Sequence, residues 1–166
     1  MIDQTPENKT YRRLTGLADN REAAVAVAQV AKRELALFSH DLEPLLYDKE
    51  DFLKAVQVVA TRSRMSRIRI VCKDPGTSIR AGHRLITMAQ RFSSYMEVRR
   101  ASKDHEQMAE TFLVADEEAV LFRPLASRYE GYADVHAPFE ARQFLKTFSD
   151  IWEKAEPDPE FRRLGI

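Results

Sequence analysis

The chain has 166 residues, of which 44% are hydrophobic and 31% are charged, and its formal net charge at pH 7 is zero. These values are typical of a single globular domain, and they exclude a disordered or fibrous chain. No apolar run approaches the roughly 20 residues that span a bilayer, and the N-terminal sequence lacks the apolar core of a secretory signal. The single cysteine, Cys72, excludes an internal disulfide framework. We therefore expect a cytoplasmic protein that does not associate with membranes.

The neutral total hides an uneven distribution of charge along the chain. Residues 61–103 hold eleven Lys and Arg residues and two acidic residues, a net charge of +9, so the remainder carries −9. Residues 104–122 contain six acidic residues and no Lys or Arg. Such asymmetry is typical of a chain that binds a nucleic acid or a charged partner.

The N-terminal half alternates helical and strand patterns. Asp19 and Glu22 have the spacing of a capping box at the start of a helix. Phe52, Val56 and Val59 recur at helical spacing on one face. The predicted order is a flexible arm over residues 1–18, a helix over 21–33, a strand over 35–38, a helix over 48–63 and a strand over 67–73.

The C-terminal half begins with a turn signal, Asp74-Pro75-Gly76, after which Thr77 is suited to cap a helix. An acidic turn around Asp116 separates two apolar runs, a pattern that predicts a hairpin. The predicted order is a helix over residues 77–92, a strand over 95–101, a short helix over 103–109, strands over 111–115, 119–123 and 131–136, a helix over 138–155 and a tail over 157–166.

This order predicts one α/β domain over residues 19–156. Alternating strands and helices favour right-handed crossovers and a parallel sheet, and the final hairpin adds antiparallel strands. We therefore expect a mixed, largely parallel central sheet with helices on both faces.

From about residue 35 to residue 155, the chain resembles one half-unit of the phospholipase D superfamily. In that family a strand carries His-x-Lys-x4-Asp, and an antiparallel partner strand carries Gly-Ser-x-Asn. The sequence FLVADEEAVLF, residues 112–122, matches the strand, the turn and the partner strand. The chain is also similar to an uncharacterised bacterial domain that occurs alone or behind an acetyltransferase-like domain.

The family motif is degenerate in this chain. With Asp116 at the Asp position, Ala109 takes the place of the His and Thr111 the place of the Lys. The family mechanism needs an imidazole nucleophile and a cation on the phosphoryl oxygens, and neither residue supplies them. Phe122-Arg123-Pro124-Leu125 stands roughly where Gly-Ser-x-Asn is expected. The resemblance thus implies a non-catalytic module with no catalytic residue and no cofactor. The alternative is a hydrolase or transferase with a relocated histidine, His83 or His105, next to Asp116.

A basic stripe is the strongest binding signal. Arg80, Arg84, Thr87 and Arg91 share one face of the predicted 77–92 helix, with His83 beside them. Together with two arginines before this helix, they predict a surface for a phosphate-bearing ligand, such as a nucleic acid. Those two arginines are Arg62 and Arg67. The alternative is a solvated face paired with acidic residues elsewhere in the chain.

Three further expectations concern partners and metals. The charge asymmetry also fits a homodimer, in which the basic face of one copy meets the acidic face of another. The resemblance leaves open a regulatory module that acts with an acetyltransferase. Ser39-His40-Asp41 follows the first strand, but neighbours on a strand point to opposite faces, so they do not form a catalytic triad. No second cluster supports metal ligation there, and we predict no metal site.

Overall fold

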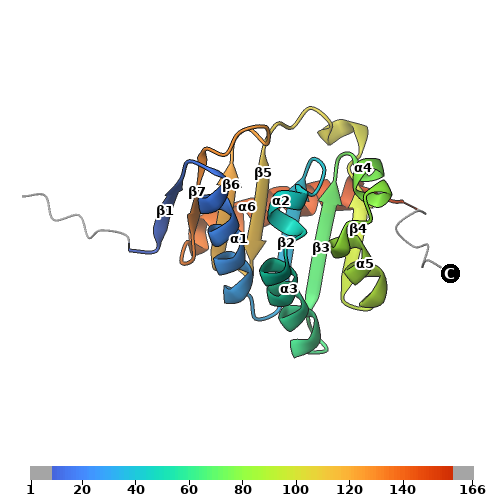
Figure 1. Ribbon diagram of the computed structural model, residues 1–166, viewed down its shortest axis with the longest axis horizontal. Coiled ribbons are helices and arrows are strands. Elements are labelled where there is room, and N and C mark those ends of the chain that lie inside the picture. Colours follow the sequence, from blue (N-terminus) through green and yellow to red (C-terminus); the bar gives the residue numbers. More distant parts are fainter. Residues whose placement is uncertain (1–8, 159–166) are drawn as a thin grey trace, which may run out of the picture.

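The computed structural model describes residues 9–158, which fold around one eight-stranded sheet in the order β1-β7-β6-β5-β2-β3-β4-β8 (Figure 1). The strands are β1 Tyr11–Leu14, β2 Glu34–Ser39, β3 Arg67–Cys72, β4 Met96–Arg100, β5 Thr111–Ala115, β6 Ala119–Arg123, β7 Gly131–Asp134 and β8 Glu156–Pro157. The helices are α1 Leu17–Val30, α2 Pro44–Tyr47, α3 Glu50–Arg62, α4 Pro75–Arg80, α5 Arg84–Arg91, the 3-10 helix η1 Lys103–His105 and α6 Pro138–Lys154.

The sheet is mixed, which confirms the predicted α/β class. Strands β2, β3 and β4 are parallel, and Leu37, Ile70 and Val98 lie in register across them. The remaining pairs are antiparallel, including the predicted hairpin of β5 and β6. The parallel strands lie off-centre, with β5, β6, β7 and β1 on one side and only the short β8 on the other. Most pairs in residues 9–158 are thus antiparallel and the expected largely parallel sheet is wrong, because β5, β6 and β7 follow one another without crossover helices.

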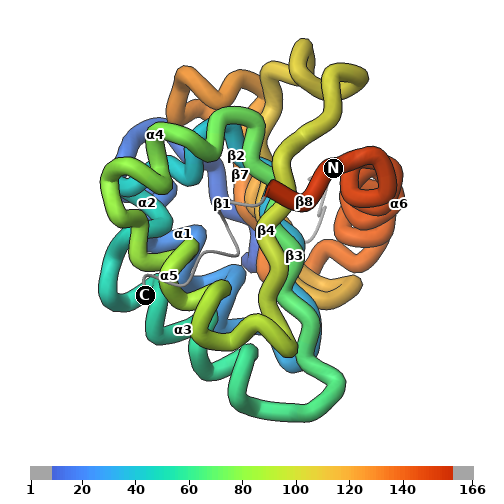
Figure 2. Tube along the Cα trace, turned by 90° about the vertical axis from the view of Figure 1, so that its right-hand side faces the viewer, coloured from blue at the N-terminus to red at the C-terminus, as the bar shows by residue number. Residues whose placement is uncertain are grey.

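Helices cover both faces of the sheet, as predicted, but unequally. Figure 2 shows α6 alone on one face and α1 to α5 on the other. Because side chains alternate along a strand, β3 sends Ile68 and Ile70 into the core under α1 to α5 and Val71 into the core under α6. The helices of residues 9–158 all lack the combination of length and apolar character that a membrane crossing requires.

The continuous helix predicted over residues 77–92 is wrong, because the chain breaks between α4 and α5. Gly82 adopts φ +69°, a left-handed conformation that a continuous α-helix does not contain. His83 follows as the N-cap of α5, and its side chain accepts a hydrogen bond from the amide of Leu85. The new helix therefore points in a direction that helical spacing in the sequence did not predict.

The two ends of the predicted domain also differ from expectation. Residues 11–14, which we expected in a flexible arm, form edge strand β1, where Tyr11 stacks on Tyr132 of β7 at 5.5 Å between ring centroids. Glu156 and Pro157 form the short strand β8 against β4. The remaining parts of the predicted arm and tail, residues 1–8 and 159–166, lie outside the described residues.

Replacing Gly82 by alanine should lower the free energy of unfolding by about 1 kcal/mol, because a Cβ disfavours the left-handed conformation. No atom lies within 4 Å of the added Cβ, so backbone strain is the only cost expected. Urea unfolding followed by circular dichroism measures the difference. Gly82→Asn is the control and should cost less, because asparagine tolerates this conformation. Equal stability of Gly82→Ala and the wild type would contradict the assignment.

Candidate functional site

The edge of the sheet where β2 and β3 end is here called the carboxyl edge, because open α/β sheets gather ligands beyond the carboxyl ends of parallel strands. Strand β5 runs antiparallel to β2, with Phe112 opposite Phe38, so Thr111 lies at this edge. Its hydroxyl is fully buried and donates to the carbonyl of Phe38 at 2.7 Å. The position of the family lysine thus holds a hydroxyl that is already committed to the backbone.

A buried ion pair lies next to Thr111 at the carboxyl edge. Arg123 of β6 pairs with Thr111 across the hairpin, and its side chain is 1% exposed. Its two terminal nitrogens donate to the carboxylate of Glu43 at 3.0 and 2.7 Å. Its Nε donates to the carbonyl of Arg128 at 2.8 Å, and Ala126 supplies a further carbonyl. Four of the five N–H groups of the buried guanidinium are therefore committed to the protein.

Two opposing effects act on the pKa of Glu43, the carboxylic acid of this pair. Burial raises the pKa of Glu43, and the neighbouring Arg123 opposes that increase. Sequence reasoning missed the pair because an arginine at the end of an apolar strand resembles an exposed strand end. Glu43 and Arg123 are 80 residues apart in the sequence, so only the folded structure shows that they pair.

The side chains of Ser39 and Asp41 accept backbone amides of the loop that follows β2. The buried hydroxyl of Ser39 accepts from the amide of Leu42 at 3.0 Å, which closes the loop after β2. Cys72 is buried beside this loop, and burial raises its pKa to about 12. Residues 9–158 contain no group of three His, Cys, Asp or Glu side chains that would hold a metal ion.

His83 serves the fold and has no free ring nitrogen. Its side chain is buried, and Nδ1 accepts from the amide of Leu85 at 3.1 Å. Because Nδ1 accepts, Nε2 carries the proton and donates to the carbonyl of Leu42 at 2.8 Å. Burial lowers the pKa of His83. His83 is therefore a buried helix cap and does not lie on the basic surface, where we expected it.

His105 lies between a hydroxyl and a carboxylate, but at long distances. Its Nδ1 is 3.4 Å from the hydroxyl of Ser102, and its Nε2 is 3.3 Å from the carboxylate of Asp150. The side chain of Asp150 is 61% exposed, and Ser102 is the N-cap residue of η1. These contacts exceed the 2.6–3.2 Å range expected for a nucleophile and its base.

Asp116 anchors the opposite end of the sheet. Its carboxylate accepts three backbone amides, from Lys32 at 2.8 Å, Arg33 at 3.0 Å and Glu34 at 2.9 Å. Its φ of +51° places the carboxylate over the start of β2, whereas the partners of His83 follow the end of β2. Neither His83 nor His105 contacts Asp116, so the relocated active site of the alternative hypothesis is not formed.

The sheet divides the arginines that sequence spacing had grouped on one surface. Arg84 and Arg91 are exposed on α5, and we call this surface, with Thr87 between them, the α5 arginine face. Arg80 belongs to α4 and lies beyond the break at Gly82. Arg67 lies on the α6 side of the sheet, together with Arg69. The last member of the predicted set, Arg62, donates to the carbonyl of Ala31 at 2.9 Å.

Solved structures with similar architecture define the class of the fold, which is that of phospholipase D. Nuc from Salmonella typhimurium, a phospholipase D family member, is 17% identical with a TM-score of 0.58, over 83% of this chain and 90% of its own. NucT from Helicobacter pylori is 10% identical with a TM-score of 0.61, over 89% of this chain and 99% of its own. TrmBL2, an archaeal chromatin protein whose structure shows a mode of DNA binding, is 18% identical with a TM-score of 0.65. The match to TrmBL2 covers 95% of this chain and 57% of that one.

The sequence itself matches the family described as "Domain of unknown function (DUF7931)" over residues 16–164, and the chain belongs to that family. No curated protein sequence matches the chain. The predicted phospholipase D-like fold is thus confirmed.

Asp116→Ala should lower the free energy of unfolding by about 2–3 kcal/mol, because three amides lose a charged acceptor. Thermal and urea unfolding measure the loss. Asp116→Asn is the matched control, since it keeps one acceptor oxygen and tolerates positive φ, and it should recover part of the stability. An alanine variant as stable as the wild type would show that the carboxylate is not an anchor.

His83 should make the fold sensitive to mild acid. Its pKa in the folded state lies below the ordinary value of 6.5, so below pH 6.5 the unfolded state binds more protons and stability falls as the pH falls. The slope from one such group reaches at most about 1.4 kcal/mol per pH unit. His83→Asn keeps an N-cap side chain that does not titrate. Urea unfolding between pH 7 and pH 5 should show a shallower loss for this variant, and parallel curves would contradict the assignment.

Proposed function

We propose that the chain is a non-catalytic binding module with a phospholipase D-like fold, which binds duplex nucleic acid through its exposed arginines. The observation that carries the proposal is the charge left unpaired on the surface. Seven arginines of residues 61–103 have exposed side chains, and only Arg84 and Arg100 form ion pairs with described residues. The alternative of a basic face neutralised by acidic residues of the same chain is therefore disfavoured.

The lack of catalysis is argued from the carboxyl edge. Ala109 has no nucleophilic side chain. The hydroxyl of Thr111 donates to the carbonyl of Phe38, and Arg123 donates to Glu43 and to two backbone carbonyls. A covalent phosphodiesterase mechanism requires a nucleophile and free donors for the developing charge. Ala109, Thr111 and Arg123 supply neither.

The α5 arginine face is the part of the surface best suited to a polyanion. Arg84 is 56% exposed, and Asp48 pairs with part of its charge: Nε donates to the carboxylate at 2.6 Å and Nη2 to the Asp48 carbonyl at 3.1 Å, which fixes the side chain at the surface. Arg91 lies over its neighbour Phe92 at 5.2 Å from the ring centroid. Two cations spaced two helical turns apart suit successive backbone phosphates. The DNA binding of TrmBL2, which shares the fold, supports this choice of ligand.

Two finer expectations stay predictions within this proposal. A homodimer would place two basic surfaces on one duplex and would raise the effective affinity. An acetyltransferase-like partner would make the module a targeting appendage for that enzyme. Size-exclusion chromatography with light scattering tests the first, and co-purification tests the second.

Fluorescence anisotropy with a labelled DNA duplex should show binding at about 50 mM salt that weakens steeply with added salt, because phosphate contacts release counterions. Arg84→Glu combined with Arg91→Glu should weaken the affinity about tenfold or more, which corresponds to about 1.4 kcal/mol. The matched control reverses two exposed charges on α6, Arg142→Glu with Lys146→Glu, and should have a smaller effect.

Three outcomes would count against the proposal. Absence of binding at low salt would remove the nucleic-acid function. An equal loss in the α5 and α6 double variants would show that net charge, and not the α5 arginine face, controls binding. Turnover of bis(p-nitrophenyl) phosphate by the purified protein would overturn the non-catalytic assignment.

A further inference from the structure

A second basic site lies on the other side of the sheet, under α6. Arg67 and Arg69 project from β3, and Arg99 projects from the neighbouring strand β4, where it is in register with Val71. We call the cavity that they line, together with the Trp152 ring of α6, the arginine pocket. Its volume is about 500 Å³, and Ser149 and Glu153 complete the lining. No sequence motif predicted it, because the arginines lie on two strands that helical spacing does not relate.

The cations of the arginine pocket are short of partners. Neither Arg67 nor Arg69 forms an ion pair with any residue in the described part of the chain, whereas Arg99 contacts the carboxylate of Glu97 at 3.1 Å. The buried Nε atoms of Arg69 and Arg99 have no hydrogen-bond partner among residues 9–158. Burial, and then the nearby charges of Arg67 and Arg99, lower the pKa of Arg69. Glu97 and Glu153 offset part of the positive charge, but Arg67 and Arg69 stay outside any ion pair with a described residue, and this excess of like charge favours the binding of an anion.

Aromatic rings hold the guanidinium groups in place. Arg99 lies 3.9 Å from the centroid of the Trp152 ring and donates to the Trp152 carbonyl at 3.0 Å. Arg69 lies 5.1 Å from the centroid of the Phe148 ring. A cation stacked on an aromatic face keeps its in-plane N–H groups free to donate. Arg69 and Arg99 are therefore ordered before a ligand arrives, which lowers the entropic cost of binding.

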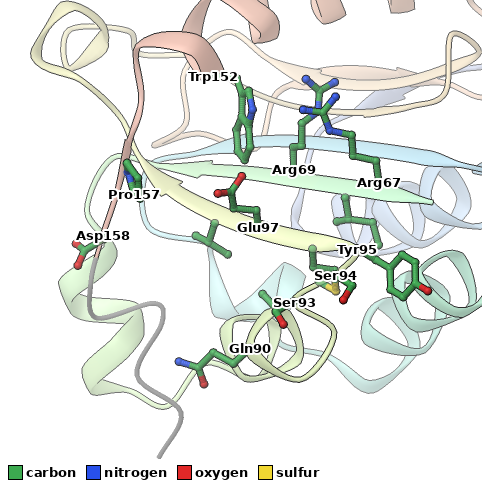
Figure 3. A pocket seen from close by; sticks show the side chains of 14 residues that line it. Arg67, Arg69, Gln90, Ser93, Ser94, Tyr95, Glu97, Trp152, Pro157 and Asp158 are labelled. Carbon is green, nitrogen blue, oxygen red and sulfur yellow. The ribbon is translucent and has the colours of Figure 1, made fainter. Parts of the chain in front are cut away.

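The arginine pocket opens into a larger, polar cavity. This cavity of about 570 Å³ shares Arg67, Arg69 and Trp152 and continues along β4, whose first half is not covered by β8. Figure 3 shows Arg67 and Arg69 at one end and the polar side chains of α5 and the following loop at the other. Those polar side chains are Gln90, Ser93, Ser94 and Tyr95. The volume lies within the roughly 300–1,000 Å³ range of small-molecule sites.

We infer that the arginine pocket binds the phosphate group of a small phosphate ester, whose polar body extends along β4 toward Ser93 and Ser94. Guanidinium groups recognise phosphate oxygens by paired hydrogen bonds. Arg67 and Arg69, which form no ion pair with a described residue, together match the two charges of a phosphate dianion better than the single charge of a carboxylate. The half-buried position of Arg69 favours a compact ligand over the backbone of a duplex. This site is separate from the α5 arginine face, which lies across the sheet.

Trp152 is the only tryptophan of the chain, so its emission reports on this pocket directly. Titration of the full chain with AMP should change the emission in a saturable manner. Inorganic phosphate should compete more weakly, because it lacks the body, and adenosine should have no effect, because it lacks the phosphate. Arg67→Gln and Arg69→Met should each weaken AMP binding about tenfold or more, a loss of about 1.4 kcal/mol.

Arg64→Gln is the matched control, because it removes an exposed arginine that does not line the pocket. It should leave AMP binding unchanged, as should the Arg84→Glu, Arg91→Glu double variant, whatever its effect on DNA. A dissociation constant of 1 mM corresponds to about 4 kcal/mol of binding free energy, so a titration to about 10 mM would detect even weak binding. The absence of a saturable change in emission with AMP or phosphate up to that concentration would overturn the inference. An AMP response unaffected by Arg67→Gln, or equally reduced by Arg64→Gln, would also overturn it.

Discussion

The buried ion pair between Arg123 and Glu43 is the interaction around which the carboxyl edge is organised. A guanidinium at 1% exposure is stable only if its charge and its donors are matched inside the protein. Glu43 matches the charge, and the carbonyls of Ala126 and Arg128 take up further donors. The pair thereby ties the loop after β2 to the segment between β6 and β7. Breaking such a pair typically costs about 3–5 kcal/mol, so the edge is held closed in this arrangement.

The polar side chains around this pair also bond within the protein. The carboxyl edge has become a place of structural bonding, in which Thr111, Ser39 and His83 all direct their polar atoms to the backbone. Asp116 has an equivalent task at the other end of β2, where it accepts three amides. Polar residues that resemble an active site in sequence are here the means by which loops are closed.

The binding that we propose rests on the arginines, which the sheet separates into two groups. The α5 arginine face is exposed, and an extended polyanion could reach its cations. The arginine pocket is recessed, and its cations are ordered by Trp152 and Phe148. Because the two groups lie on opposite faces, a nucleic acid and a small phosphate ester would not compete for the same arginines.

The sequence by itself determined the order of strands β2 to β7 and of helices α1, α3 and α6, the hairpin of residues 111–115 and 119–123, and the loss of the family His and Lys at Ala109 and Thr111. Periodicity, turn chemistry and motif spacing are local properties, so they survive without knowledge of the fold. Only the tertiary structure decided that His83 is a buried cap, that Glu43 neutralises Arg123, and that Arg67 joins Arg69 and Arg99 away from Arg84. Those contacts join residues that are far apart in the chain or lie on different strands. They depend on the turn at Gly82 and on the alternation of side chains between the two faces of a strand. Helical spacing in the sequence predicts neither feature.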